Sequence, residues 1–269
     1  MRGASRPSFE DLREQLDAAL TSAGQARHVG DGLFSVTGLL DREHGLRRAL
    51  SDPGKPAAEK AAIAGQLLHG KITQATEDLV ASAAEKRWAS STDLADAIEG
   101  LGMESLARQA EYEGSLDDLE DQLFRFGRLV DAQPDLRSAL TGNAPAEIKS
   151  ELLSGLLQGK VTPIALNLIN QVVLHPRGRS LPAALELCAQ IAADRRQQLI
   201  AVVRVVNDLS ARQKSRLAAA LAGAYGHDVH LNVVIDPTVV GGISIQIGDE
   251  LIDGTAVARL AAVRRRLAA

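Results

Sequence analysis

The sequence predicts a mainly α-helical protein, with two tandem helical bundles followed by a small α/β domain at the C-terminus. Aromatic residues make up only 3% of the 269 residues, while Ala and Leu recur throughout, and small aliphatic interiors are typical of helix bundles. A helical apolar pattern occurs twice, and a β-branched pattern begins near Leu199. The expected domains are residues 1–112, 113–198 and 199–269.

An internal repeat predicts the two bundles. When the sequence is shifted by ninety places, Leu33-Phe34 falls on Leu123-Phe124, and Ala49-Leu50 falls on Ala139-Leu140. Apolar residues at i, i+4, i+7 and i+11 mark one face of a helix, and both copies keep this spacing. These residues are Val29, Leu33, Val36 and Leu40 in the first copy, and Leu119, Leu123, Phe126 and Val130 in the second.

The residues that start and end the helices repeat as well, after a gap of one residue. Pro suits a first helical turn, Gly suits the position after a last turn, and Thr caps the next helix. Each copy is therefore expected to contain a long helix, a short one, a helix after a proline and a helix after a threonine. The paired positions are Leu50 and Leu140, Pro56 and Pro145, Gly70 and Gly159, and Thr73 and Thr162.

Two further segments complete the expected organisation. The segment from Ser91 to Glu113, which we expect to be broken at Gly100 and Gly102, closes the first bundle and leads into the second. From Leu199 onward the pattern has period two and β-branched residues, as in strands. The expected elements there are a strand at Val202–Val206, a helix at Ser210–Ala224, strands at Val229–Ile235 and Val239–Ile247, a short strand at Leu251-Ile252, and a final helix with Val257, Leu260, Val263 and Leu267 on its apolar side.

Composition and charge argue against several classes of protein. A formal net charge of -4 argues against nucleic-acid binding, which needs many uncompensated basic side chains; the run Arg264–Arg266 suits the last turn of a helix. A single cysteine, Cys188, allows no internal disulfide, and its apolar neighbours predict burial. No run of about eighteen apolar residues occurs, so we expect neither a standard export signal nor direct membrane insertion.

Two motifs resemble a phosphate-binding loop and a metal site, but each lacks a feature that such a site needs. The segment Gly65–Lys71 matches the start of a phosphate-binding loop, but Ile72 stands where a hydroxyl group must reach magnesium. His227 and His230 have the spacing of metal ligands, but Val229 begins a strand and sends them in different directions. We find no catalytic constellation, and we expect no cofactor, nucleotide or metal. Trp88 is expected in a core or an interface.

The segment Val234–Thr255 closely resembles the C-terminal motif of F-type ATP synthase delta subunits, the family that includes the mitochondrial oligomycin-sensitivity-conferring protein. The resemblance rests on a glycine pair, a Gly-Asp turn and an Ile-Asp-Gly segment in the family's order. The glycine pair permits a bulge or positive φ, and Gly-Asp suits a tight hairpin turn. The family-marking positions, all structural, are Gly241, Gly242, Gly248, Asp249 and Asp253.

The resemblance implies a non-catalytic stator subunit. Its helical bundles would grip amphipathic N-terminal helices of the alpha subunits of the catalytic head, and its C-terminal domain would hold the peripheral-stalk b subunit. The duplicated bundle is similar to the enlarged delta subunits of actinobacteria, and either copy or both could hold an alpha-subunit helix. A separate stalk subunit and a location at the cytoplasmic face of the bacterial plasma membrane, peripheral through the complex, are implied. The alternative is a helical-repeat adaptor unrelated to ATP synthase.

The resemblance also implies where a partner helix docks. In the family this groove lies between the first and fifth helices of a bundle. For the first copy these helices are expected near Phe9–Leu20 and Thr73–Ser90. The candidate partner-binding residues are Leu12, Leu16, Leu79 and Ala83 in the first copy, and Leu168, Ile169, Val172 and Val173 in the second.

Overall fold

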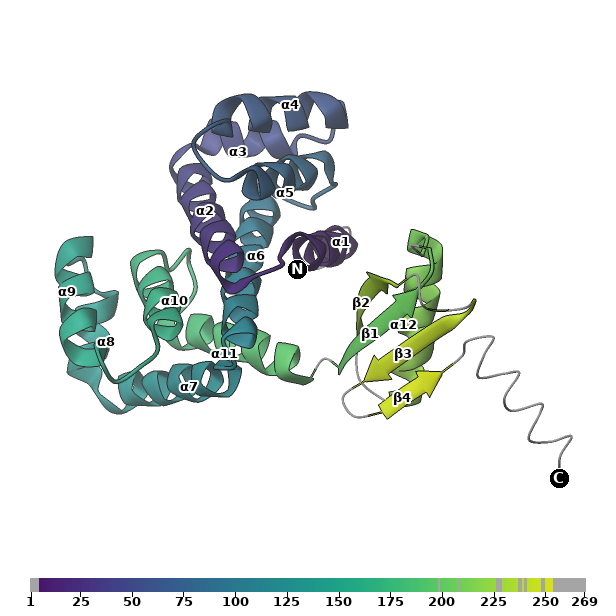
Figure 1. The fold of residues 1–269 in the computed structure, drawn as a ribbon. Coiled ribbons are helices and arrows are strands. Elements are labelled where there is room, and N and C mark those ends of the chain that lie inside the picture. Colours follow the sequence, from purple (N-terminus) through teal and green to yellow (C-terminus); the bar gives the residue numbers. More distant parts are fainter. Residues whose placement is uncertain are drawn as a thin grey trace, which may run out of the picture. The chain divides into compact units, whose positions relative to one another are not determined.

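The computed structural model describes residues 5–197, 199–207, 209–225, 229–236, 239, 241–247 and 250–253. The chain forms two compact units, Met1–Arg195 and Arg196–Ala269 (Figure 1). The first unit is helical and the second contains a small sheet, so the predicted fold class is confirmed. The expected boundary at residue 199 lies close to the boundary between the two units.

The first unit repeats its helices in the same order. The first copy contains α1 (Ser5–Ala19) and α2 to α6, and the second contains α7 to α11. In the first copy the bounds are α2 Ala23–Arg42, α3 His44–Ser51, α4 Ala57–Leu68, α5 Gln74–Glu85 and α6 Ser91–Tyr112. In the second they are α7 Leu116–Ala132, α8 Pro134–Thr141, α9 Ala146–Leu157, α10 Pro163–Leu174 and α11 Leu181–Gln197.

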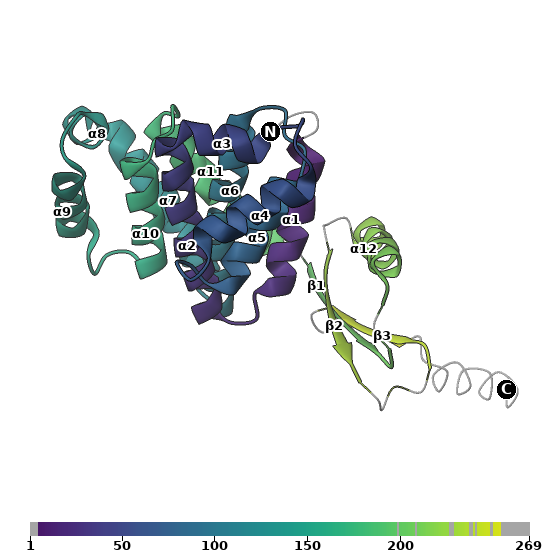
Figure 2. The ribbon, with the colours of Figure 1, turned by 90° about the horizontal axis from the view of Figure 1, so that it is seen from above.

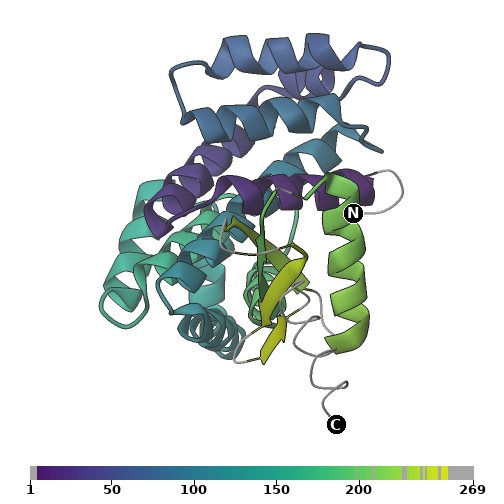
Figure 3. The same cartoon turned by 45° about the vertical axis from the view of Figure 1, so that its right-hand side comes forward.

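Equivalent residues occupy equivalent places in the two copies. Leu33 and Leu123 are both fully buried, and Leu68 and Leu157 are 5% and 6% exposed. In each copy the two helices after the short one form a hairpin, shown for α4 and α5 in Figure 3. The internal repeat predicted from the sequence is therefore a repeat of structure.

The residues at the helix ends cap and stop the helices as predicted. The hydroxyl group of Thr73 accepts a hydrogen bond from the amide of Thr76 at 3.3 Å, and Thr162 accepts one from Ala165 at 3.2 Å. Gly70 and Gly159 end the preceding helices with φ of 71° and 74°. An L side chain rarely adopts this left-handed conformation, so glycine suits both positions.

The expected break in the segment Ser91–Glu113 is wrong, because α6 is one continuous helix. A Cβ atom at Gly100 would lie 3.0 Å from the ring of Phe9, and one at Gly102 would lie 2.7 Å from the ring of Phe34. The two glycines thus make room for aromatic rings instead of ending the helix.

Helix α6 belongs to both cores. Its Ile98 and Leu101 pack in the first core, and its Met103 and Leu106 pack in the second. Shifted by ninety places, α1 falls on residues 95–109 of α6, so this helix closes the first copy and opens the second. Figure 1 shows α6 running from the helices of the first copy to those of the second, and Figure 2 shows α8, α9 and α10 of the second copy on one side of the unit and α1 on the other. The boundary expected at residues 112 and 113 therefore separates two repeats within one compact unit.

The C-terminal unit contains a four-stranded sheet in the order β2-β1-β3-β4. Strand β1 pairs with β2 in parallel and with β3 antiparallel, and β3 pairs antiparallel with β4. Helix α12 (Ala211–Tyr225) covers one face, where the buried side chains of β1 alternate (Figure 1). The strands are β1 Leu199–Val205, β2 Val229–Ile235, β3 Ile243–Ile247 and β4 Glu250–Asp253.

Strand β3 is shorter than the predicted strand Val239–Ile247. Gly241 and Gly242 precede it with φ of 63° and 89°, values that lie outside strand geometry. The expectation of positive φ at this glycine pair is therefore confirmed, and it explains the late start of β3. The predicted terminal helix lies outside the described residues.

Among the described residues, no helix is both long enough and apolar enough to cross a membrane.

Candidate interaction surfaces

The candidate groove residues of the first copy face the core of their own unit. Leu12 and Leu16 on α1 are fully buried, Leu79 on α5 is 3% exposed, and Ala83 is fully buried. All four belong to the first hydrophobic core. They therefore hold α1 and α5 against each other and line no open groove in this structure.

The candidate residues of the second copy are buried in the same way. Their side chains are at most 3% exposed, and they belong to the second core. They lie on α10, which packs against α6, α7 and α9. The residues are Leu168, Ile169, Val172 and Val173. Docking of a partner helix at these eight positions stays a prediction, and it requires the packed helices to separate.

Polar contacts also close the seam at the N-terminal part of α1. The hydroxyl group of Ser8 donates to the carbonyl oxygen of Arg87 at 2.9 Å, and Lys86 forms an ion pair with Asp11. Ser5 accepts a hydrogen bond from the amide of Ala89 at 2.9 Å. These contacts fasten α1 to the segment that joins α5 and α6.

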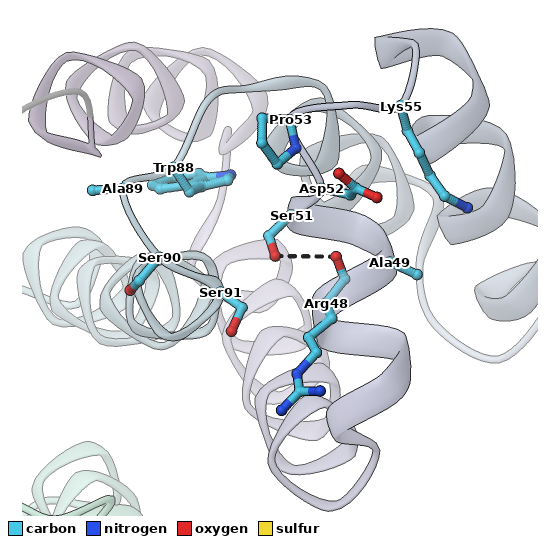
Figure 4. A pocket seen from close by; sticks show the side chains of 10 residues that line it. All are labelled: Arg48, Ala49, Ser51, Asp52, Pro53, Lys55, Trp88, Ala89, Ser90 and Ser91. Carbon is cyan, nitrogen blue, oxygen red and sulfur yellow. Dashed lines mark hydrogen bonds between the residues drawn. The ribbon is translucent and has the colours of Figure 1, made fainter.

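A shallow pocket of about 510 Å³ opens between α3 and the segment joining α5 and α6 (Figure 4). Three of its polar side chains have partners within the chain. Ser51 donates to the carbonyl oxygens of Arg47 and Arg48, and the indole of Trp88 donates to Ala83 at 2.8 Å. Ser90 caps α6. These side chains serve local structure.

The segment Gly65–Lys71 lies across the last turns of α4 and the turn after it. A phosphate-binding loop instead joins a strand to a helix, so the fold around this motif is that of a helix end. Within the described ranges, no group of three or more His, Cys, Asp or Glu residues could hold a metal ion. His227 and the side chain of His230 lie outside the described residues.

Cys188 is buried on α11, as predicted. Burial, with a smaller contribution from Glu99, raises the pKa of its thiol to about 12. A thiol with so high a pKa stays protonated at neutral pH and reacts slowly with alkylating reagents.

A buried ion cluster fastens the end of α11 to the first copy. The guanidinium group of Arg195 lies 2.9 Å from Asp17 on α1, and 3.1 Å and 3.3 Å from Glu104 and Glu111 on α6. Arg13 adds a second contact to Glu104 at 2.8 Å. The cluster therefore joins three helices that lie far apart in the sequence.

In this cluster, opposite charges offset the cost of burying each charged group. Burial lowers the pKa of Arg195, but Asp17, Glu104 and Glu111 together raise it above its ordinary value. For Glu104, burial raises the pKa, while Arg13 and Arg195 oppose this shift. Arg195 thus stays charged, and removing it would take the most buried positive charge of the cluster away from these carboxylates.

A second ion cluster fastens the segment between α10 and α11 to the first copy. Arg177 lies 2.8 Å from Asp41, 3.1 Å from Asp96 and 2.9 Å from the fully buried Glu99, which also pairs with Arg179. Arg177 has a φ of 48°, which is uncommon for a residue with a side chain. The ion pairs offset the cost of this conformation.

Neither cluster was predicted from the sequence. Glu99 and Glu104 lie on α6 among apolar neighbours, and Arg177 and Arg195 follow some eighty to ninety residues later in the sequence. The one available signal was the presence of Glu99 and Glu104 within an otherwise apolar stretch, because a buried acid requires a partner.

The family-marking residues lie around the β3–β4 hairpin of the C-terminal unit. Ile247 pairs with Glu250 across the hairpin, and Asp253 pairs with Ser244. Gly248 and Asp249, predicted to form its turn, lie outside the described residues.

The two edge strands of this sheet expose apolar side chains. Ile235 on β2 is 59% exposed and Leu251 on β4 is 60% exposed, while Val234 and Ile252 are exposed by 41% and 38%. Edge strands that expose apolar side chains are common sites of association with other chains.

The sequence that forms the second copy and the C-terminal sheet matches a known family. The family model described as the ATP synthase delta (OSCP) subunit matches residues 103–267, more than half of the chain. The chain belongs to this family. The match begins within α6, where this helix enters the second core. The family's own bundle therefore corresponds to the second copy, and the first copy precedes it.

Curated relatives share the whole length of the chain. ATP synthase subunit delta of Streptomyces griseus is 46% identical and the match covers 100% of both chains. The proteins of the same name from Streptomyces avermitilis and Thermobifida fusca are also 46% identical, with at least 98% of each chain covered. The resemblance to the enlarged actinobacterial form is thus confirmed. A chain in the Toxoplasma gondii mitochondrial ATP synthase hexamer matches 63% of this chain and 97% of its own length, at 20% identity and a TM-score of 0.30.

Proposed function

We propose that this chain is the non-catalytic stator subunit of a rotary ATP synthase. In this role the helical unit holds amphipathic N-terminal helices of the alpha subunits in the catalytic head, and the C-terminal unit holds the end of the peripheral-stalk b subunit. The chain prevents the head from turning with the rotor, so that proton-driven rotation is used for ATP synthesis. It lies peripherally at the cytoplasmic face of the plasma membrane through the complex.

The observation that carries this proposal is the family match over residues 103–267, which includes the second copy and the C-terminal sheet. Full-length similarity to ATP synthase delta subunits extends the support to the first copy.

The two buried ion clusters support a mechanical role. A stator must transmit force between its binding surfaces without yielding. The clusters around Arg177 and Arg195 fasten the second copy to the first at both ends of α11. Together with the shared helix α6, they join the two copies in one compact unit.

The exposed apolar edge strands support a contact in the C-terminal unit. Burying Ile235 and Leu251 against a partner would remove apolar surface from water, at about 25 cal/mol per Å² before the entropic costs of association. An amphipathic helix of the stalk supplies a suitable apolar face.

Purification of the full-length tagged chain from detergent-solubilised membranes tests the proposal. We expect alpha, beta and b subunits to co-purify in constant proportion. Removal of residues 254–269 and the double change Ile235→Ser and Leu251→Ser should reduce recovery of b more than recovery of alpha. A soluble complex without alpha and b would instead favour a helical-repeat adaptor unrelated to ATP synthase.

A further inference from the structure

One face of α2 is buried at the junction between the two copies. The equivalent face of α7, in the second copy, is exposed. Phe34 on α2 and Phe124 on α7 are equivalent residues, because each follows a fully buried leucine of the repeated pattern. Phe34 is only 8% exposed, whereas Phe124 is 59% exposed. Both helices bury the leucine before this phenylalanine, but other helices cover Phe34 on α2 and leave Phe124 on α7 exposed.

Two helices cover this face in the first copy: the shared helix α6, and α10 of the second copy. The ring of Phe34 packs against Gly102 of α6, where an added Cβ atom would be 2.7 Å away, and it belongs to the second core. One helical turn earlier, Asp31 accepts a hydrogen bond at 3.0 Å from the side-chain amide of Asn167 on α10. The face therefore packs against helices that present a small residue and an amide donor.

The second copy keeps both residues of this face. Asp121 stands in the place of Asp31, and Phe124 in the place of Phe34. Asp121 pairs with Arg125 at 2.9 Å, and the guanidinium group of Arg128 lies 6.0 Å from the centre of the Phe124 ring.

The equivalent helix of the second copy, α11, cannot take over the covering role. Ser90 caps α6 and Ser180 caps α11, and counted from these caps Ala192 stands in the place of Gly102. Ala192 is fully buried. A ring placed as in the first copy would meet its methyl group, because even Gly102 leaves no room for a Cβ atom. Phe124 is consequently turned to solvent.

We propose that the α7 face formed by Asp121 and Phe124 docks an amphipathic helix of another polypeptide, in the way that α2 docks the second copy. Such a helix presents a small residue to the ring and an amide donor to the carboxylate. This inference rests on the proposed function, under which the partner helix belongs to the catalytic head. A second copy of this chain does not fit, because its Asn167 is already bonded to its own Asp31.

Single exposed aromatic residues are common on protein surfaces and need no partner. Phe124 differs from such residues because its equivalent, Phe34, is buried under other helices of the same chain. These helices show what packs on this face when it is covered.

Cysteine protection on the full-length chain tests the inference. The variant Phe124→Cys places one accessible thiol on this face, while the buried Cys188, with its raised pKa, reacts slowly with maleimide. The probe is the purified catalytic head, stripped of this subunit. The matched control is Ile148→Cys on α9, where the side chain is 54% exposed.

We expect the thiol introduced by Phe124→Cys to react quickly in the isolated chain and about tenfold or more slowly once the head is bound, while the thiol of the control variant is unaffected. Because this change itself removes the ring, the head is supplied at a concentration shown to saturate the variant. Equal labelling of Phe124→Cys with and without the head at that concentration would overturn the inference and leave the proposed function intact. Slow labelling in the isolated chain would overturn it too, because this chain itself would then cover the face. Failure of the wild-type chain to bind the head would refute the proposed function and this inference together.

An affinity measurement makes the test independent of labelling. Phe124→Ser should raise the dissociation constant for the head by about tenfold or more, while the control Ile148→Ser changes it less than about twofold. Unchanged circular dichroism spectra would establish that both variants fold. Equal affinities for the two variants would contradict the proposal.

Discussion

The guanidinium group of Arg195 lies 3.1 Å from the carboxylate of Glu104, and this pair joins the last described turns of α11 to the middle of α6. Both side chains are at most 4% exposed. A buried ion pair of this kind contributes little compared with apolar packing, but its disruption is costly because one charge remains buried alone. Separating the two copies at this point would therefore be costly.

Replacing Arg195 by alanine should lower the free energy of unfolding of the helical unit by about 3–5 kcal/mol, because Asp17 and Glu104 would lose their buried counter-charge. Urea denaturation followed by the fluorescence of the single tryptophan, Trp88, reports on this unit. The control is Arg27→Ala, whose ion pair with Asp31 is exposed and should be worth less than about 1 kcal/mol. Equal effects of the two changes would contradict this assignment.

Adding a methyl group at Gly102 should destabilise the helical unit by about 1–3 kcal/mol, since the new Cβ atom would lie 2.7 Å from the ring of Phe34. Gly155 on α9 is the matched control because nothing lies within 4 Å of its added Cβ position. There the change to alanine should stabilise the helix by about 0.5–1 kcal/mol. Thermal melts of the two variants should therefore shift in opposite directions, and a shared upward shift would refute tight packing at Gly102.

Replacement of Leu79 by glutamate should unfold the first copy, because this side chain is only 3% exposed within the core. Its burial also argues against an open partner groove at this position. The milder Leu79→Ala should cost about 2–5 kcal/mol, as should the equivalent Leu168→Ala in the second copy. Circular dichroism of Leu79→Glu measures the outcome directly, and a native spectrum with an unchanged melting temperature would restore the exposed-groove interpretation.

The pH dependence of stability should change in Asp96→Asn. Burial raises the pKa of Asp96 above its ordinary value of 3.8, although Arg177 opposes this shift. The folded chain therefore binds this proton more tightly than the unfolded chain, and the group's contribution to stability is lost as pH rises from about 4 through the raised pKa. Asparagine does not titrate.

Denaturation of wild type and Asp96→Asn at a series of pH values checks this sign. The wild-type stability, relative to that of the variant, should fall as pH increases over that window. Parallel curves would show that the environment of Asp96 leaves its pKa unshifted.

Local signals in the sequence predicted most of the helices and strands. The helix after Thr73 and the helix after Thr162 begin where their caps predict, because a hydroxyl group can satisfy a free amide of the first turn without help from the rest of the fold. Strand β2 has the predicted bounds, Val229–Ile235, because apolar and polar residues alternate from Val229 to Val233 and two β-branched residues end the segment.

Features that depend on distant residues could not be predicted in this way. Gly100 and Gly102 suggested a helix break, but Phe9 and Phe34 pack against them from other helices. An apolar stripe also fits a core and a groove equally well, so Leu79 could not be assigned to either from spacing alone.

Coupling between rotation and catalysis tests the central claim most directly. Membrane vesicles that carry the enzyme are depleted of this chain, then supplied with purified chain, and proton-driven ATP synthesis is measured alongside ATP hydrolysis by the released head. We expect synthesis to disappear on depletion and return on addition of the wild-type chain, while hydrolysis per head stays unchanged. Synthesis that continues without the chain, or a change in the intrinsic hydrolysis rate, would contradict a stator role.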